Sequence, residues 1–321
     1  MKNHVNLKKE ASTNYKFVQK TIWSTIRTHL PKDQVSATKT KLKKDAVNLS
    51  FFIRNPANVL MSHGVADKNY MFIKDDNGGR LLNEFDHVLV PGPWLKKRIL
   101  KNKAITLTEN QIHVVGWPRL DHLCELQRKS LRGRLSKFVK STLKLEKTNV
   151  LWAPTHNYVT PKKLKFRKED KSASSFPDMC EFTKDLESQF NYNIALHPRN
   201  QTKKQRKPTT EMLVKADVVI SDFGTMVYEA WSLGKPVIFP RWIIKDRVIN
   251  LNPGSAEALI FEKRIGLHAD SYEELVEMAK KNKRVGHDVK EFMEEYLPSK
   301  YLGKSGKVIA ELLTTLPIQN K

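Results

Sequence analysis

Residues 216–230 have the sequence ADVVISDFGTMVYEA, in which an apolar run meets small and polar residues and then a helical pattern. The unbroken run Val218 to Ile220 is typical of a strand that is covered on both faces of a parallel sheet. Gly224 suits a tight turn, and the residues from Thr225 onward suit a helix. This segment therefore predicts a strand, a turn and a helix, the repeating unit of an α/β fold.

The same unit recurs on both sides of this segment. Other short apolar runs end in small or polar residues, and stretches long enough for helices separate them. They occupy residues 58–61, 87–90, 112–115, 150–153, 192–196 and 236–239. The chain has 321 residues, more than the roughly 250 at which single cores usually stop growing. We therefore expect two Rossmann-like domains, over residues 1–124 and 149–321, joined by a basic helical connection over 125–148.

The first fifty residues are rich in lysine and contain one amphipathic pattern. Apolar residues fall on one helical face before Pro31, namely Phe17, Ile22, Trp23, Ile26 and Leu30. Such a helix suits either an interfacial membrane anchor or a first helix packed on a sheet. Only about 57 residues precede the first recognised strand, so the N-terminal domain is either trimmed or takes its opening elements from residues 1–50.

The charge balance points to anionic partners. Lys and Arg number 57 against 34 Asp and Glu, a net charge of +23. Nucleic acid, an acidic membrane leaflet and a polyphosphate substrate all fit, and so do solvated charges without a partner. Cys124 and Cys180 lie far apart without metal-ligand spacing, so no metal site is predicted. With neither a signal peptide nor an apolar run of eighteen residues, we expect a cytoplasmic protein.

The helix start after Ser221 is the main candidate for chemistry. The first backbone amides of a helix are unsatisfied and lie at its positive end, so a diphosphate can bind there beside Gly224 and Thr225. Glu229 follows one turn later, where a carboxylate can accept ribose hydroxyls. The alternative is structural, with Ser221 or Asp222 only capping the helix.

Polar residues at other strand ends extend this candidate site. His197 and Arg199 follow the run 192–196, where they can neutralise charge on a leaving phosphate. His63 follows the run 58–61 and can act as a general base at neutral pH. Lys68, a few residues later, is either a charge contact to substrate or a solvated side chain.

The order of these motifs resembles the CDP-glycerol glycerophosphotransferases of teichoic acid and capsule synthesis. The resemblance covers roughly residues 58–245 and rests on His63-Gly64, Val115-Gly116-Trp117-Pro118-Arg119-Leu120-Asp121, Trp152-Ala153-Pro154-Thr155, His197, Ser221-Asp222-Phe223-Gly224-Thr225 and Lys235-Pro236-Val237-Ile238-Phe239. It implies a GT-B-like fold, two Rossmann-like domains facing a cleft, with no catalytic metal. No cofactor is expected.

The resemblance also implies roles for single residues. His63 would be the base and His197 would lie near the donor diphosphate. The donor-binding set would be Pro154, Thr155, Arg199, Ser221, Asp222, Gly224, Thr225 and Glu229, and the further contacts to acceptor or phosphate would be Lys68, Arg119 and Asp121. Phe223 and Gly224 stand where the family usually has Tyr and Ser.

The predicted function is transfer of a phosphoalcohol, such as glycerol phosphate from CDP-glycerol, to a hydroxyl of an anionic or lipid-linked surface polymer, releasing CMP. We expect the enzyme to be peripheral on the inner, anionic face of the cell membrane. One alternative is a GT-B glycosyltransferase that uses a nucleotide sugar, since fold does not decide the donor. A second is a nucleic-acid-binding protein, although the sequence has no zinc-finger, helix-turn-helix or RNA-binding motif.

Overall fold

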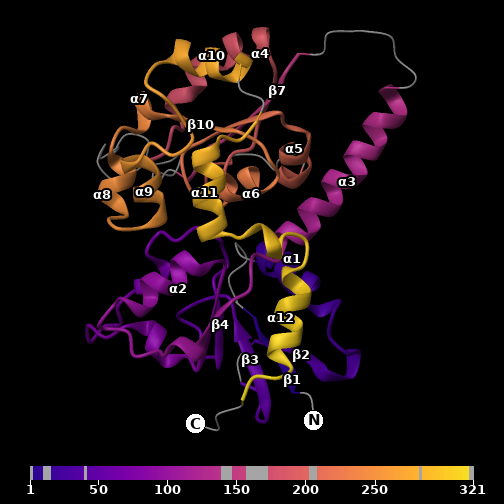
Figure 1. The fold of residues 1–321 in the computed structure, drawn as a ribbon, viewed down its shortest axis with the longest axis vertical. Coiled ribbons are helices and arrows are strands. Elements are labelled where there is room, and N and C mark those ends of the chain that lie inside the picture. The colour runs from indigo at the N-terminus through magenta and orange to yellow at the C-terminus, as the bar shows by residue number, and fades with distance from the viewer. Residues whose placement is uncertain are drawn as a thin grey trace. The chain divides into compact units, whose positions relative to one another are not determined.

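The chain forms two compact α/β units in this computed structural model. It describes residues 3–9, 16–39, 42–138, 147–156, 173–201, 208–281 and 284–317. The first unit contains residues 1–122 together with 293–321, and the second contains residues 123–292. Figure 1 shows the elements of both units. The predicted fold class is confirmed.

The first unit is built on a six-stranded parallel sheet of order β2-β1-β3-β4-β5-β6. Its strands are β1 (His4–Lys8), β2 (Val35–Thr38), β3 (Ala46–Ser50), β4 (Val59–Met61), β5 (His87–Val90) and β6 (Ile112–Val114). Every residue of β3, β4 and β5 is buried, so both faces of the sheet are covered. Because β1, β2 and β3 lie within residues 1–50, the N-terminal segment supplies the opening of this unit and is not trimmed.

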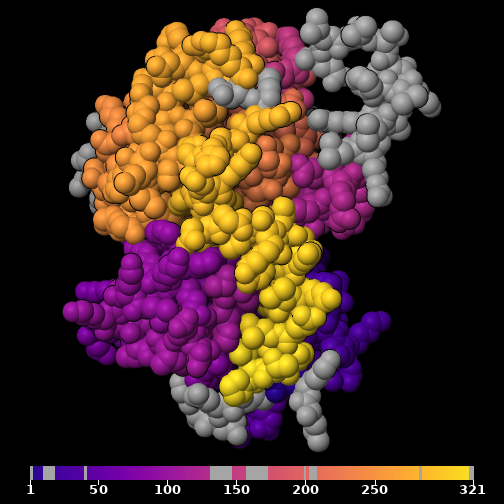
Figure 2. All heavy atoms as spheres, viewed as in Figure 1, coloured from indigo at the N-terminus to yellow at the C-terminus, as the bar shows by residue number. Residues whose placement is uncertain are grey.

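Helices α1 (Lys16–Arg27), α2 (Pro93–Leu100) and α12 (Ser305–Leu313) belong to this unit. Helix α1 packs on α12, and Figure 2 shows α12, in yellow, at the surface of the first unit. Ile22 and Ile26 have no exposed surface, and Trp23 has 9%. The apolar face of α1 is therefore used inside the protein, which supports the packed helix over the membrane anchor; the side chain of Phe17 lies outside the described residues.

A row of polar side chains crosses the first sheet at one level. The amide of Asn6 on β1 donates to Oδ1 of Asn48 on β3 (2.7 Å), and the amide of Asn48 donates to Oδ1 of Asn58 (3.0 Å). Asn58 in turn donates to Oδ2 of Asp86 (3.1 Å). Asn6 and Asn48 are buried, and a buried amide is tolerated only when its hydrogen bonds are satisfied. The row therefore fixes the relative register of these segments.

The second unit contains a five-stranded parallel sheet of order β11-β10-β9-β7-β8. Its strands are β7 (Asn149–Ala153), β8 (Asn191–Ile194), β9 (Val218–Ser221), β10 (Val237–Pro240) and β11 (Leu267–Ala269). Its helices are α4 (Thr183–Gln189), α5 (Thr209–Lys215), α6 (Thr225–Ser232), α7 (Arg241–Ile244), α8 (Arg247–Leu251), α9 (Ala256–Glu262) and α10 (Tyr272–Lys281). Two further helices, α3 (Arg119–Phe138) and α11 (His287–Tyr296), contain the two boundaries between the units.

The division of the chain differs from the predicted one at its C-terminus. Residues 293–321 were expected in the C-terminal domain but belong to the first unit. The backbone amide of Asn3 donates to the oxygen of Thr314 (3.0 Å), and Asp121 binds the start of α12. These contacts join residues that are far apart in the sequence, by 184 and 185 positions for Asp121, which local patterns do not reveal. The predicted connection begins as helix α3, and residues 139–146 lie outside the described ones.

No helix among the described residues is long and apolar enough to cross a membrane.

Candidate functional site

The polar strand ends of the second unit meet at a topological switch point. Strand β7 lies between β8 and β9, so the chain leaves β7 towards one neighbour and returns on the other side. Open α/β sheets bind ligands beyond the carboxyl ends of strands at such a point. The predicted helix start after Ser221 and the predicted pair Pro154 and Thr155 follow β9 and β7, and so occur together there.

Ser221 and Asp222 join these two strand ends. The hydroxyl of Ser221 donates to the backbone oxygen of Ala153 (2.7 Å), and the backbone amide of Thr155 donates to Oδ2 of Asp222 (2.8 Å). Both side chains have no exposed surface. Their hydrogen bonds therefore fix the backbone at the switch point. A phosphate bound there would contact this backbone. Pro154 and Thr155 are also buried.

The carboxyl group of Asp222 has an unusual proton affinity. Burial raises the pKa of Asp222 from 3.8 to about 6, and hydrogen bonds from Ser175, Thr155 and Ser174 only partly oppose this. The folded chain therefore binds this proton more tightly than the unfolded chain does. Its contribution to stability is full below pH 3.8 and is lost as the pH rises through about 6, so at neutral pH the buried charge is unfavourable.

We expect the stability of Asp222→Asn relative to wild type to be higher at pH 8 than at pH 5 by about 1 kcal/mol, because the amide carries no charge that burial disfavours. At pH 5 wild-type Asp222 is largely protonated, so the charge that the substitution removes is mostly absent there. Urea unfolding of both proteins at the two pH values measures the difference. Equal differences at pH 5 and pH 8 would show that the charge of Asp222 is not the cause.

Helix α6 starts directly beyond these residues. Gly224 precedes it with φ 106° and ψ −167°, a conformation that is open to glycine and strained for serine. Gly224 stands where the family usually has Ser, and the backbone at this position has a conformation that requires glycine. Thr225 is partly exposed at the first helical position, whereas Glu229 has no exposed surface. The ribose contact of Glu229 stays a prediction, and the buried position of its side chain does not favour it.

Two histidines lie side by side at the ends of β7 and β8. The ring centroids of His156 and His197 are 4.9 Å apart, and the rings are inclined by 39°. Thr155, just before His156, is fixed by Asp222 through its amide and by the Ser174 hydroxyl through its oxygen (2.8 Å). Sequence reasoning identified His197 but missed His156. The signal was its place immediately after Pro154-Thr155, at a strand end adjacent to that of His197.

Arg199 belongs to the turn Pro198–Asn200 that follows His197. The amide of Asn200 donates to the oxygen of His197 (2.8 Å), and Asn200 is buried. The turn is therefore anchored beside the histidine pair. The side chain of Arg199 lies outside the described residues.

In the first unit, His63 follows β4 in a bend. Its ring stacks on Phe52 with centroids 4.9 Å apart, and Tyr70 meets it edge-on at 5.1 Å. Phe52 comes just after β3, the neighbour of β4. The imidazole is therefore held between two aromatic rings at the carboxyl end of the sheet.

The other predicted residues of the first unit differ in their exposure and in their contacts. Lys68 is partly exposed in the loop after His63, and Arg119 is partly exposed at the start of α3. Asp121 differs from the expectation, because its carboxylate accepts the backbone amides of Ser305 (3.1 Å) and Gly306 (2.7 Å) at the start of α12. Burial raises the pKa of Asp121, and these two hydrogen bonds oppose the shift. Its side chain caps a helix, and we assign it no contact with the acceptor.

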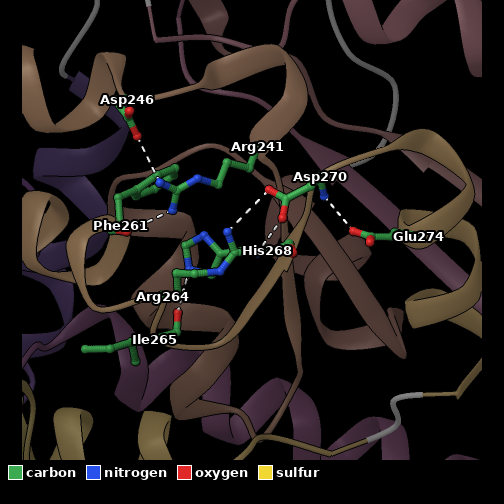
Figure 3. Close-up of polar contacts among 8 residues, drawn as sticks. All are labelled: Arg241, Asp246, Phe261, Arg264, Ile265, His268, Asp270 and Glu274. Carbon is green, nitrogen blue, oxygen red and sulfur yellow. Dashed lines mark hydrogen bonds and ion pairs between the residues drawn. The ribbon is translucent and has the colours of Figure 1, made fainter.

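A further polar group lies around β10 and β11 (Figure 3). Arg241, just after β10, pairs with Asp246 (2.9 Å), while Arg264 pairs with Asp270 (2.8 Å), just after β11. His268 is buried beneath them, and burial lowers its pKa to about 4. These cations have carboxylate partners within the group. We therefore interpret it as a structural tie between loops.

The described residues contain no group of three or more His, Cys, Asp or Glu side chains that is arranged to hold a metal ion.

Comparison with solved structures identifies the architecture. A variant of the wall teichoic acid polymerase TagF matches with a TM-score of 0.62 and 16% sequence identity, over 96% of this chain and 88% of that chain. TagF without a stated variant gives 0.60 and 15%, over 96% and 87%. A TagF variant soaked with CDPG gives 0.61 and 14%, with the same coverage. At this identity the likeness shows the fold, which is GT-B-like as predicted.

No curated protein sequence matches this chain closely enough to carry a comparison.

Comparison with protein families confirms the predicted resemblance. Residues 56–297 match the family described as CDP-glycerol:poly(glycerophosphate) glycerophosphotransferase. The match covers more than half of the chain, including His63, the β7 and β9 strand ends and the histidine pair. The chain therefore belongs to the CDP-glycerol:poly(glycerophosphate) glycerophosphotransferase family.

Proposed function

We propose that this enzyme transfers glycerol phosphate from CDP-glycerol to a hydroxyl of a teichoic-acid-type polymer, with the donor held at the β7–β9 switch point. The observation that carries the proposal is the structure of that point in a chain of this family. Ser221 and Asp222 fix two strand ends, and the amides of α6 begin directly beyond them. A helix N-terminus favours an anion through its free amides and its dipole.

In the proposed reaction the acceptor oxygen attacks the phosphorus that carries the glycerol. The bond from this phosphorus to the bridging oxygen breaks, and CMP leaves with the electron pair. His63 takes the proton of the acceptor hydroxyl. A correctly placed general base contributes roughly 10²- to 10⁴-fold to a rate.

In the donor, negative charge develops on the bridging oxygen when its bond to phosphorus breaks, and positive charge is needed beside it. We place His197 and His156 there because their rings lie together at the ends of β8 and β7. An imidazolium beside the bridging oxygen stabilises the charge that develops on the leaving CMP. The α6 amides and Arg199 would hold the remaining phosphate oxygens.

Binding to an anionic membrane surface and to a lipid-linked acceptor stays a prediction. The net charge of +23 suits an acidic leaflet or a polyanionic product. A lipid-linked acceptor fits the same chemistry, because only its free hydroxyl reacts.

The donor is tested by offering the purified enzyme CDP-glycerol, UDP-glucose and UDP-N-acetylglucosamine in separate reactions with a glycerophosphate oligomer. We expect CMP release that depends on the acceptor, and no UDP release. Products should gain one glycerol phosphate at a time by mass spectrometry. UDP release at a higher rate than CMP release would favour the nucleotide-sugar alternative and overturn the proposal.

A further inference from the structure

The loop that follows His63 contains two neighbouring residues in the left-handed backbone region. Lys68 has φ 43° and Asn69 has φ 57°. Asparagine tolerates this region, whereas lysine rarely adopts it. Such a conformation persists only where surrounding contacts impose it, and these outliers gather at functional sites.

Contacts from Arg98 on α2 impose the left-handed conformation of Lys68 and Asn69. Its Nη1 forms an ion pair with Oδ2 of Asp67 (2.6 Å), and its Nη2 donates to Oδ1 of Asn69 (2.5 Å). The guanidinium thus binds the residues before and after Lys68. Asp67 is only 2% exposed, and Arg98 stacks over the ring of Phe72 at 4.1 Å. A planar fork matches two such acceptors, which a lysine ammonium does not.

The loop that this clamp holds also carries the partner of His63. Tyr70 follows Asn69 directly, and its hydroxyl oxygen accepts the amide of Ile53 (2.8 Å). Its ring meets His63 edge-on. Displacement of residues 67–69 would therefore move Tyr70 and release one side of the imidazole.

We propose that Arg98 is a positioning residue for the transfer reaction. It holds the strained turn at Lys68 and Asn69, and through Tyr70 it fixes the ring of His63 towards the acceptor hydroxyl. The inference rests on the role of His63 in the proposed function. It adds a residue on α2 that acts through others and touches neither substrate.

The test removes the clamp without leaving a buried charge. In Asp67→Asn/Arg98→Ala we expect kcat for CMP release to fall about 30-fold, with the donor KM changed less than about threefold, because misplacement of about 1 Å costs up to about 100-fold. Arg98→Lys should lose nearly as much, since a lysine ammonium does not match both acceptors. Loss of a residue that only stabilised the fold would lower the fraction of folded protein without lowering kcat of the protein that is folded.

Lys97→Ala is the matched control, because Lys97 neighbours Arg98 on α2 but forms an exposed ion pair with Glu295 (2.7 Å). It should leave kcat unchanged. Hydrogen exchange of the peptide 62–73 gives a readout without catalysis: exchange should rise at least about fivefold in the double variant and stay at the wild-type level in Lys97→Ala.

Unchanged kcat or unchanged exchange in the double variant would overturn the inference. His63→Gln, assayed in parallel, separates it from the proposed function. An inactive His63→Gln with a fully active double variant removes only Arg98 from the mechanism, whereas an active His63→Gln removes the catalytic role on which the inference rests.

Discussion

His63→Gln should lower kcat for CMP release by about 10³-fold while the protein stays folded. The substitution keeps a polar side chain between Phe52 and Tyr70 but removes the group that accepts a proton near neutral pH. Donor affinity should change little, because the proposed donor site lies in the second unit. The measurement is steady-state CMP release, with calorimetric titration of CDP-glycerol for binding.

The control for this variant is His29→Gln, an exposed histidine of the same unit beyond α1. It should retain the wild-type rate. The pH profile adds a second criterion, because the acidic limb of kcat should disappear when the base is lost. A His63→Gln rate within about threefold of wild type would exclude His63 as the base.

His197→Ala should lower kcat/KM for CDP-glycerol by about 10²- to 10³-fold, the usual loss when one preorganised charge-stabilising group is removed. The loss should be shared with His156, whose ring lies 4.9 Å from that of His197. We expect His156→Ala to cost about tenfold. The double variant should be less impaired than the product of the two single effects, because the histidines act on the same phosphate.

The measurements are CMP-release kinetics of the four proteins and the affinity of each for CDP. His287→Ala is the control, since His287 is exposed in the second unit and faces Glu291 across one helical turn. Full additivity of His156→Ala and His197→Ala would show that the two rings do not share a function. Normal kinetics of His197→Ala would remove the pair from the mechanism.

Strands whose residues are all apolar could be predicted from the sequence. The runs that became β4, β5, β9 and β10 are hydrophobic at nearly every position, as strands covered on both faces must be. Strands β1 and β3 were missed because Asn6, Lys8, Asn48 and Ser50 interrupt them. These polar residues are buried nonetheless, and Asn6 and Asn48 are satisfied by one another. That compensation comes from neighbouring strands, which a single segment does not disclose.

The candidate site could also be predicted only in part from the sequence. Its location at the β7 and β9 strand ends was predicted, because polar residues directly after a buried strand are visible in the sequence. The orientation of Ser221 and Asp222 was not, since both face the neighbouring strand rather than solvent. The partners of Asp121 and Arg98 are contributed by distant segments or by loop backbone conformation, and neither follows from residue order.

The first unit is formed by two separate segments of the chain, which affects its folding during translation. Residues 1–122 leave the ribosome well before residues 293–321, which complete the same unit. At about 5–20 residues per second, roughly 10–40 s pass between the synthesis of residue 122 and that of α12. The second unit is continuous in sequence and can finish in that interval, while the buried face of α1 waits without its cover. Until α12 has been synthesised, the face of α1 that carries Ile22 and Ile26 therefore lacks the part of its cover that α12 supplies.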